Sequence, residues 1–331
     1  MVRIRKEPPG VNSRAMSGKK PSGSLLIFVV GLLCLVWGST WFVIKVGLED
    51  IPPFTGAGIR FALAALGMSL VAHLFAGKEG GDPPPVRLVL AMGGLNFAAS
   101  YGIVYWVETR VPSALVSVLW ASYPIFLSVV STVLLPEESL RGRQWFGLVV
   151  GFAGIAILFA RDLSTLGAEV VVAGAVLLLS PLVSAVGTAL VKRDGAGVSS
   201  LLLNRNGMIL GAALLLGLAM LTESGQEVRW TGSAVGSLLY LSFVGTVFTF
   251  GLYYWAMRYA PAYQLGMIAY ITPAIAIALG VGLGGEPVTR FTLLGGGLVL
   301  VGVTGVLSRP ASPGPAGGRA PAGPSEAEGD S

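Results

Sequence analysis

Long apolar stretches alternate with short polar ones over most of the chain. A membrane-spanning helix needs about 20 mostly apolar residues to cross roughly 30 Å of hydrocarbon, and these stretches are too long and continuous for the strands of a membrane barrel. The short connections between them hold most of the charged and turn-forming residues. We therefore predict an all-α membrane protein with ten transmembrane helices, at residues 24–45, 54–76, 87–107, 112–135, 144–160, 169–191, 198–222, 233–257, 261–284 and 291–308.

Composition agrees with this pattern. Of the 331 residues, 53% are hydrophobic and 12% are charged, whereas soluble domains contain about 25% charged residues. The chain has one cysteine, Cys34, and one histidine, His73, which excludes a disulfide within the chain and any cysteine-based or multi-histidine metal site. We expect no metal, no cofactor and no catalytic residues, and therefore not an enzyme.

The two ends of the chain differ from the apolar part. Residues 1–23 are basic and rich in Pro, Gly and Ser, while residues 309–331 are rich in Pro, Gly and Ala and end in acidic side chains. Such segments cannot bury a core, so we expect two disordered tails. The first apolar stretch lacks a small-residue cleavage site at its end, which favours an uncleaved helix over a signal peptide.

The distribution of Lys and Arg predicts the orientation. If the N-terminus is cytoplasmic, the inner tails and loops hold fifteen of these residues and the outer side holds five. Cytoplasmic loops of membrane proteins carry such an excess, so we expect a multi-pass protein of the inner cell membrane with both termini in the cytoplasm. The net charge of +5 reflects this topology, and we expect a lipid bilayer and no nucleic acid around the protein.

The second half of the chain repeats the first. At a constant shift of 149 residues the matched pairs are Gly102–Gly251, Tyr105–Tyr254, Trp106–Trp255, Pro112–Pro261, Pro124–Pro273, Glu137–Glu286, Arg141–Arg290 and Gly147–Gly296. Matches of rare residues in one ungapped register are hard to produce by chance. We predict two repeats, residues 24–161 and 169–308, with five helices each. Because five is odd, the second repeat must be inverted in the membrane, as in many secondary transporters.

The same motifs resemble those of the drug/metabolite transporter superfamily, in proteins with two EamA domains. The resemblance covers about residues 24–308 and rests on Trp37-Gly38-Ser39, Pro53, Arg60-Phe61, Pro124 with its counterpart Pro273, and Glu137 and Glu286, each followed four residues later by Arg. It implies a ten-helix fold with a central cavity between the halves and export or exchange of small organic solutes. The sixth span has Leu179-Ser180-Pro181 in place of a second Trp-Gly-Ser, so we do not expect a symmetric substrate site.

Two prolines, Pro124 and Pro273, lie within predicted spans. Proline removes a backbone donor and frees a carbonyl about one turn upstream, which lipid cannot satisfy. We expect both to kink helices that line a polar cavity. A packing kink inherited through duplication, without ligand contact, is the alternative.

A solute pocket needs a few hydrogen-bonding groups on an apolar, aromatic wall. Any one polar or aromatic side chain at membrane depth can instead bond its own helix or belong to the interfacial belt. As a group, the central bulky or amide-bearing side chains indicate a lined pathway. We therefore expect substrate binding by Trp37, Asn96, Tyr101, Trp120, Tyr123 and Tyr270.

Two arginines and two glutamates are further candidates. Arg60 and Arg205 lie well inside predicted spans, and an intramembrane cation is a functional hypothesis by default. A structural or gating role is preferred, because Arg can snorkel or hold carbonyls of a neighbouring helix. Glu137 and Glu286 have the i, i+4 spacing of a helix-start ion pair with the following arginine, or they latch opposite faces of the two halves.

No Asp or Glu lies in the middle of a predicted span. Proton-coupled export of organic cations relies on a buried carboxylate, so that mechanism is not expected. The pattern favours a secondary transporter, an exporter or exchanger of small neutral or zwitterionic metabolites, acting by alternating access as a monomer or homodimer. Broad-specificity drug efflux and, further away, a non-transporting membrane scaffold remain the alternatives.

Overall fold

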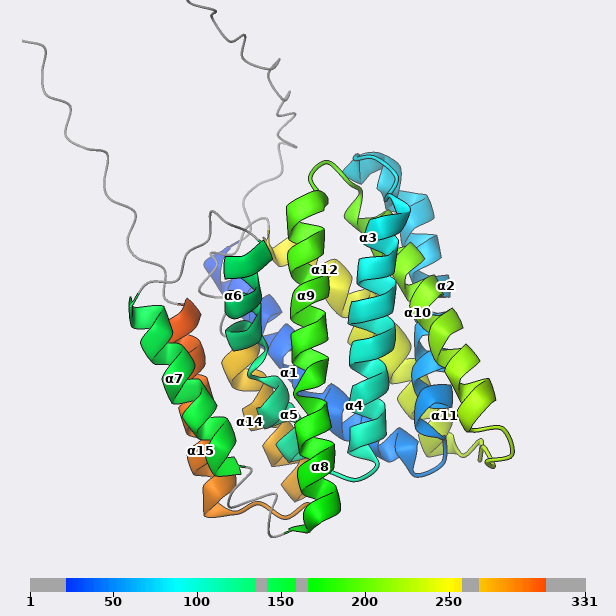
Figure 1. Ribbon diagram of the computed structural model, residues 1–331. Coiled ribbons are helices and arrows are strands. Elements are labelled where there is room, and N and C mark those ends of the chain that lie inside the picture. Colours follow the sequence, from blue (N-terminus) through cyan, green and yellow to red (C-terminus); the bar gives the residue numbers. More distant parts are fainter. Residues whose placement is uncertain (1–21, 135–141, 159–165, 258–267, 308–331) are drawn as a thin grey trace, which may run out of the picture.

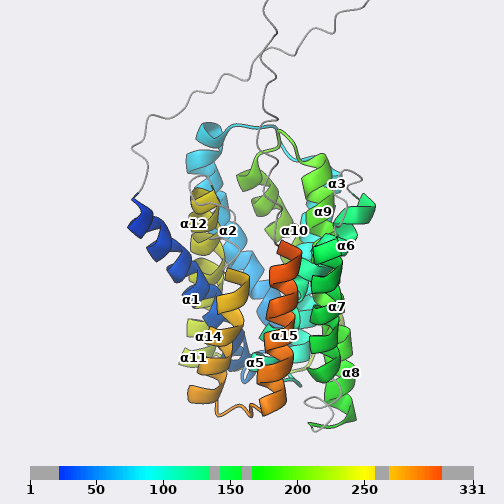
Figure 2. The ribbon, with the colours of Figure 1, turned by 90° about the vertical axis from the view of Figure 1, so that its left-hand side faces the viewer.

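The computed structural model describes residues 22–134, 142–158, 166–257 and 268–307. These residues form a bundle of helices that run side by side along one long axis (Figures 1 and 2). One isolated bridge, between Asp82 and Val198, joins two loops. The elements are α1 (Gly23–Leu48), α2 (Pro53–Glu79), α3 (Val86–Leu90), η1 (Ala91–Ala99), α4 (Ser100–Glu108), α5 (Ser113–Trp120), α6 (Tyr123–Leu134), α7 (Gly142–Ile157), α8 (Ala168–Leu177), α9 (Leu179–Asp194), α10 (Ser200–Thr222), α11 (Gly232–Leu239), η4 (Tyr240–Phe248), α12 (Thr249–Met257), α14 (Ile268–Gly282) and α15 (Arg290–Leu307).

In the described ranges, seven helical stretches are long and apolar enough to cross a membrane: Gly23–Leu48, Pro53–Glu79, Val86–Glu108, Ser113–Leu134, Ala168–Asp194, Ser200–Thr222 and Gly232–Tyr253. Three shorter apolar helices, Gly142–Ile157, Ile271–Gly282 and Arg290–Gly305, accompany them in the described ranges. Large apolar side chains such as Leu221, Met220 and Val133 are exposed on the outside of the bundle. Such a surface suits lipid, which solvates it without cost. The predicted tails lie almost wholly outside the described residues.

The two halves share an unusual backbone feature. The third predicted span contains a π-helical segment, η1, at residues 91–99, and the eighth contains another, η4, at residues 240–248. The offset is 149 residues at both ends, and α4 and α12 follow at the same offset, from residues 100 and 249. Long π-helical segments are rare, so the repeat extends from side chains to backbone geometry.

Helices from different halves pack closely through glycine. A Cβ on Gly302 of α15 would lie 2.5 Å from the Cα of Gly151 of α7, and one on Gly154 would lie 2.6 Å from the carbonyl of Gly295. Figure 2 shows α7 and α15 side by side along their length. The glycine clusters therefore act in packing, because any side chain there would push the two helices apart.

The fourth predicted span is interrupted where a kink was expected. α5 ends at Trp120 and α6 begins at Tyr123, with Ala121 and Ser122 in a turn between them. Pro124 is thus in the first turn of α6, where a missing N–H leaves no helical bond unmade. Pro273, its counterpart, lies inside α14.

Candidate functional site

Arg60, in the early part of α2, is buried and 2% exposed. Its Nε and Nη2 donate long hydrogen bonds of 3.4 and 3.3 Å to Thr246 Oγ1, and its Nη1 donates one of 3.5 Å to the hydroxyl of Tyr105. Its guanidinium carbon lies 4.9 Å from the ring centroid of Tyr101 and 5.6 Å from that of Phe61. Among the described residues no carboxylate forms an ion pair with it. Aromatic faces and hydroxyls therefore hold this cation.

Arg205, at the related place in the second half, has different surroundings. It is half-buried, and its Nε donates a 3.0 Å hydrogen bond to Oδ1 of the adjacent residue, Asn206. The structure thus does not bring the two candidate arginines into equivalent sites.

Two of the aromatic candidates meet at the interruption of the fourth span. The rings of Trp120 and Tyr123 are stacked, with centroids 5.1 Å apart and an interplanar angle of 10°. Trp120 Nε1 donates a 3.1 Å hydrogen bond to Ser180 Oγ, and the Tyr123 hydroxyl donates one of 2.9 Å to Thr188 Oγ1. Both bonds tie the turn between α5 and α6 to α9. Trp41 of α1 also contacts Trp120, with centroids 5.9 Å apart.

Trp37, Asn96 and Tyr101 lie on other helices. Trp37 of α1 packs against the rings of Tyr253 and Phe250, at 5.4 and 6.1 Å between centroids. Asn96 belongs to η1, and its Nδ2 donates to the sulfur of Met92 at 3.4 Å. Tyr101 is part of the ring cluster around Arg60.

The Asn96 Oδ1 is buried with no hydrogen-bond partner among the described residues, on the side of the helix that faces α9. A buried acceptor of this kind is available to a ligand or to water. The side chain of Tyr270 and all of Glu137 fall outside the described residues.

The clearest hollow near a candidate is a cavity of about 190 Å³ between α5, α14 and α15. Pro273 lines it, together with apolar side chains and Thr292; the other lining residues are Val118, Ala121, Ala274, Ile277, Leu293, Gly296, Gly297 and Leu300. None of the aromatic candidates whose side chains are described lines this cavity. Among the described side chains, Trp120 and Tyr123 lie together, whereas Trp37 and Asn96 have other neighbours.

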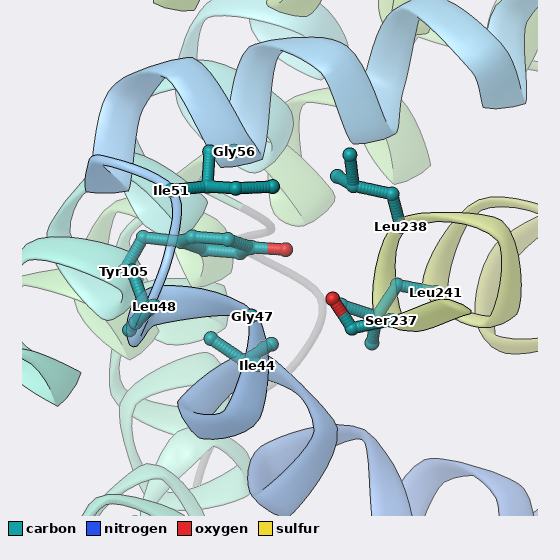
Figure 3. A pocket seen from close by; sticks show the side chains of 9 residues that line it. All are labelled: Ile44, Gly47, Leu48, Ile51, Gly56, Tyr105, Ser237, Leu238 and Leu241. Carbon is teal, nitrogen blue, oxygen red and sulfur yellow. The ribbon is translucent and has the colours of Figure 1, made fainter. Parts of the chain in front are cut away.

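A second hollow, of about 10 Å³, lies between the end of α1, the start of α2, α4 and α11 (Figure 3). The hydroxyl of Tyr105 points across it toward Ser237 and Leu238, and the other walls are apolar (Figure 3). This volume is at the lower limit for one water molecule. It marks a closed end of the bundle and is not a solute site.

Three carboxylates cap helix N-termini that belong to other parts of the chain. Glu223 accepts hydrogen bonds of 2.8 Å from the backbone nitrogens of Phe54 and Thr55 at the start of α2. Carboxylates are stabilised at such positions by the unpaired N–H groups and the helix dipole.

A matching cap lies at the other end of α2, where this helix meets the start of α10. Glu79, the last residue of α2, accepts from the nitrogen of Leu201 at 3.2 Å, from Ser199 Oγ at 2.6 Å and from Ser200 Oγ at the start of α10. Each of these two helices therefore carries, at its end, the acid that caps the start of the other.

Glu286 provides the third cap. It accepts from the nitrogens of Ser113 and Ala114, at 2.8 and 2.9 Å, where α5 begins. Arg290 lies over the ring of Phe291, at 5.0 Å, and forms no ion pair with Glu286 in the described chain. Glu286 thus connects the segment before α15 to the start of α5.

Sequence reasoning missed Glu108, the last residue of α4. The side chain is fully buried, and neither carboxylate oxygen has a hydrogen-bond partner among the described residues. Nearby, Lys45 donates a 2.6 Å hydrogen bond to the backbone carbonyl of Glu108. In the sequence Glu108 directly follows the predicted span 87–107, so it did not count as an acid in the middle of a span. One signal was present in the sequence. At the shift of 149 residues, Glu108 is matched with Met257, so this position holds an acid in the first half and an apolar residue in the second.

Comparison with known proteins gives consistent matches over both halves. The profile of the EamA-like transporter family matches residues 22–160 and again residues 172–308. The inner membrane transporter YedA of Escherichia coli (strain K12), named as uncharacterized, is 31% identical over 82% of this chain and 87% of its own length. The transporter YoaV of Bacillus subtilis, also named as uncharacterized, is 26% identical over 81% of this chain and 92% of its own.

A further relative carries a substrate class in its name. A protein of Salmonella typhimurium named as a probable amino-acid metabolite efflux pump is 26% identical over 83% of this chain and 92% of its own length. Among solved structures, one crystal structure with 18% sequence identity superposes with a TM-score of 0.62, covering 86% of this chain and 97% of the other. At that identity the likeness concerns the fold alone.

Proposed function

Because the chain belongs to the EamA-like transporter family, we propose that it is a secondary transporter that exports or exchanges small neutral or zwitterionic metabolites by alternating access. Relatives named as transporters, one of them as an inner membrane transporter, support the membrane location and the general activity. The relative named for amino-acid metabolite efflux makes neutral amino acids the first solutes to test.

The observation that carries the proposal is the reciprocal capping of α2 and α10. Glu79 at the end of α2 caps the start of α10, and Glu223 at the end of α10 caps the start of α2. Two antiparallel helices that exchange equivalent contacts at both ends are related by a two-fold axis perpendicular to them. If the helices span the membrane, this axis lies in the membrane plane, as an inverted repeat requires.

This relation supports ten spans in two inverted repeats, at residues 24–161 and 169–308. In such a transporter the halves exchange roles, so that one fold can be open to either side. The start of α1 and the end of α15 lie at the same end of the bundle (Figures 1 and 2). With the excess of Lys and Arg on that side, we place this end in the cytoplasm.

We assign the pathway to the residues around the interruption of the fourth span. Non-helical backbone at membrane depth is tolerated where it faces protein or a water-filled cavity, and the stacked Trp120 and Tyr123 lie at this turn. Tyr101 extends the aromatic surface toward Arg60. Trp37, Asn96 and Tyr270 complete the proposed lining in conformations that open the bundle.

The test is efflux of labelled neutral amino acids from sealed vesicles that contain the purified protein. We expect Trp120→Ala and Tyr101→Ala to abolish flux, and Trp145→Ala, an exposed residue of α7, to leave it unchanged. Normal flux in the first two variants would remove them from the pathway. Absence of flux of every neutral amino acid in the wild-type protein would overturn the proposed solute class.

One observation favours broad-specificity drug efflux as a second candidate. The 190 Å³ cavity between α5, α14 and α15 has mostly apolar walls, which suit apolar molecules better than zwitterions. Thermal stabilisation of the purified protein by hydrophobic dyes but not by amino acids would favour this second function.

A further inference from the structure

Glu108 is a buried acid without a structural partner. It ends α4 at the same end of the bundle as the end of α1 (Figure 1), is fully buried, and neither oxygen of its carboxylate accepts a hydrogen bond from the described residues. Buried polar groups are almost always bonded, and exceptions are common at functional sites. This side chain therefore calls for a physical explanation.

Among the described residues, none of the charged groups near Glu108 forms a hydrogen bond with its carboxylate. Lys45 of α1 donates to the backbone carbonyl of Glu108 and not to its carboxylate. Arg60 of α2 is bonded to Thr246 and Tyr105. Glu286, which precedes α15, also interacts electrostatically with Glu108, but its oxygens are taken by the start of α5.

The remaining neighbouring helix with a charged residue at this end is α8. Its Glu169 pairs with Arg110 at 3.2 Å and is exposed. Neither residue of that pair provides a hydrogen bond to the carboxylate of Glu108.

These surroundings distinguish Glu108 from Glu286, which is half-buried. Glu286 accepts two backbone N–H bonds at the start of α5, whereas the carboxylate of Glu108 accepts none from the described residues. An ionised carboxylate without any hydrogen bond in a dry interior costs far more than a neutral acid. The surroundings of Glu108 in this conformation therefore suit the neutral, protonated acid.

We propose that Glu108 is the site at which this transporter binds and releases a coupling proton. The proposal rests on the proposed transport function and adds to it the ion that drives it. When this end of the bundle opens, the carboxylate takes up a proton from water and keeps it as the bundle closes. After the helices rearrange and the opposite end opens, the proton leaves to water on that side of the membrane. No other bond forms or breaks.

The repeat limits this chemistry to one site. At the shift of 149 residues the counterpart of Glu108 is Met257, which cannot carry a proton. The site also differs from that of a cation antiporter, in which proton and organic cation compete for one carboxylate. Lys45 and Arg60 interact with Glu108 and would repel an organic cation there. One proton site beside a neutral or zwitterionic solute is the consistent arrangement.

A first experiment needs no solute. Dicyclohexylcarbodiimide modifies protonated carboxyl groups in apolar surroundings, and mass spectrometry of the purified protein locates the product. We expect modification at Glu108 that falls as pH rises and is absent in Glu108→Gln, with no modification of the exposed Glu169. Absence of modification at Glu108, or modification that does not change with pH, would overturn the proposal.

A second experiment measures coupling in sealed vesicles loaded with labelled neutral amino acids. An imposed pH gradient should stimulate wild-type flux and the flux of Glu169→Gln, and this stimulation should be lost in Glu108→Gln. Size-exclusion chromatography shows whether each variant is folded. Flux stimulated by pH to the same extent in Glu108→Gln, or stimulated only by a sodium gradient, would overturn the proton site and leave transport intact.

The two experiments separate the two claims. If no neutral amino acid moves under any gradient, the proposed solute class fails, and the carbodiimide modification alone decides whether Glu108 exchanges a proton. If flux occurs and Glu108 is modified as expected, the loss of pH stimulation in Glu108→Gln supports coupling through this residue.

Discussion

Arg60 and Arg205 lie early in the second helix of each half, yet their surroundings have little in common. Arg60 is enclosed by Tyr101, Phe61 and two hydroxyl groups, whereas Arg205 is half-buried and bonded to the next residue in the chain. The caps at the ends of the same two helices, in contrast, are equivalent. The two halves thus share the contacts that join helix ends, whereas only one of the two arginines, Arg60, is buried.

The largest difference is expected on removing the two arginines. Arg60→Ala leaves a large buried cavity, which we expect to lower the free energy of unfolding by about 3 kcal/mol, as for other large-to-small core changes. Arg205→Ala should change it by less than about 0.5 kcal/mol. The melting temperature in detergent is measured with a thiol-reactive dye, since the single cysteine, Cys34, is buried. Equal decreases in melting temperature for both variants would show that the two arginines contribute equally to stability.

The caps should give effects of intermediate and similar size in both halves. Glu79→Gln and Glu223→Gln each weaken charge-assisted bonds to a helix start, with an expected cost of roughly 1–2 kcal/mol. The same dye assay measures both melting temperatures. Glu227 is an exposed acid in the loop after α10, and Glu227→Gln is the control, whose melting temperature should equal that of the wild-type protein. A cost confined to one of the two caps would show that the ends have diverged as well.

A smaller effect is expected on changing one ring around the Arg60 guanidinium. Tyr101→Leu keeps an apolar side chain but removes the aromatic face 4.9 Å from the Arg60 guanidinium, which should cost about 1 kcal/mol. In the Arg60→Met background the same change should cost much less. Additive costs in the double variant would exclude a direct interaction.

The smallest effect is expected in the second half. Asn206→Ala removes the hydrogen bond to Arg205, and a half-exposed bond of this kind should contribute no more than about 0.5 kcal/mol. A melting temperature lowered as far as in the Tyr101 variant would show that Arg205 is also held structurally.

Much of the architecture could be predicted from the sequence, because apolar length and rare matched residues are both visible in a linear chain. The family, the helical fold and the two repeats follow from them. Two backbone features could not be predicted. The π-helical segments η1 and η4 depend on small differences in backbone geometry, and the turn at Ala121 and Ser122 replaces an expected kink, since a proline is tolerated both inside a helix and at its start.

The site was harder to predict for a different reason. Residue type suggests Trp120 and Tyr123, and the structure places them together, but which side chains share a cavity depends on packing between helices that are distant in sequence. Glu108 shows the limit most clearly. A carboxylate at the end of an apolar segment is usually solvated, and only the helices packed around it determine that this one is dry.

The positions of the two π-helical segments also record history. Both occupy the same nine-residue place in their half, 149 residues apart, and an independent origin at matching positions would require the same rare change twice. The π-helical segment is therefore older than the duplication that gave the two halves. The halves now differ at the matched positions 108 and 257, which hold an acid and a methionine.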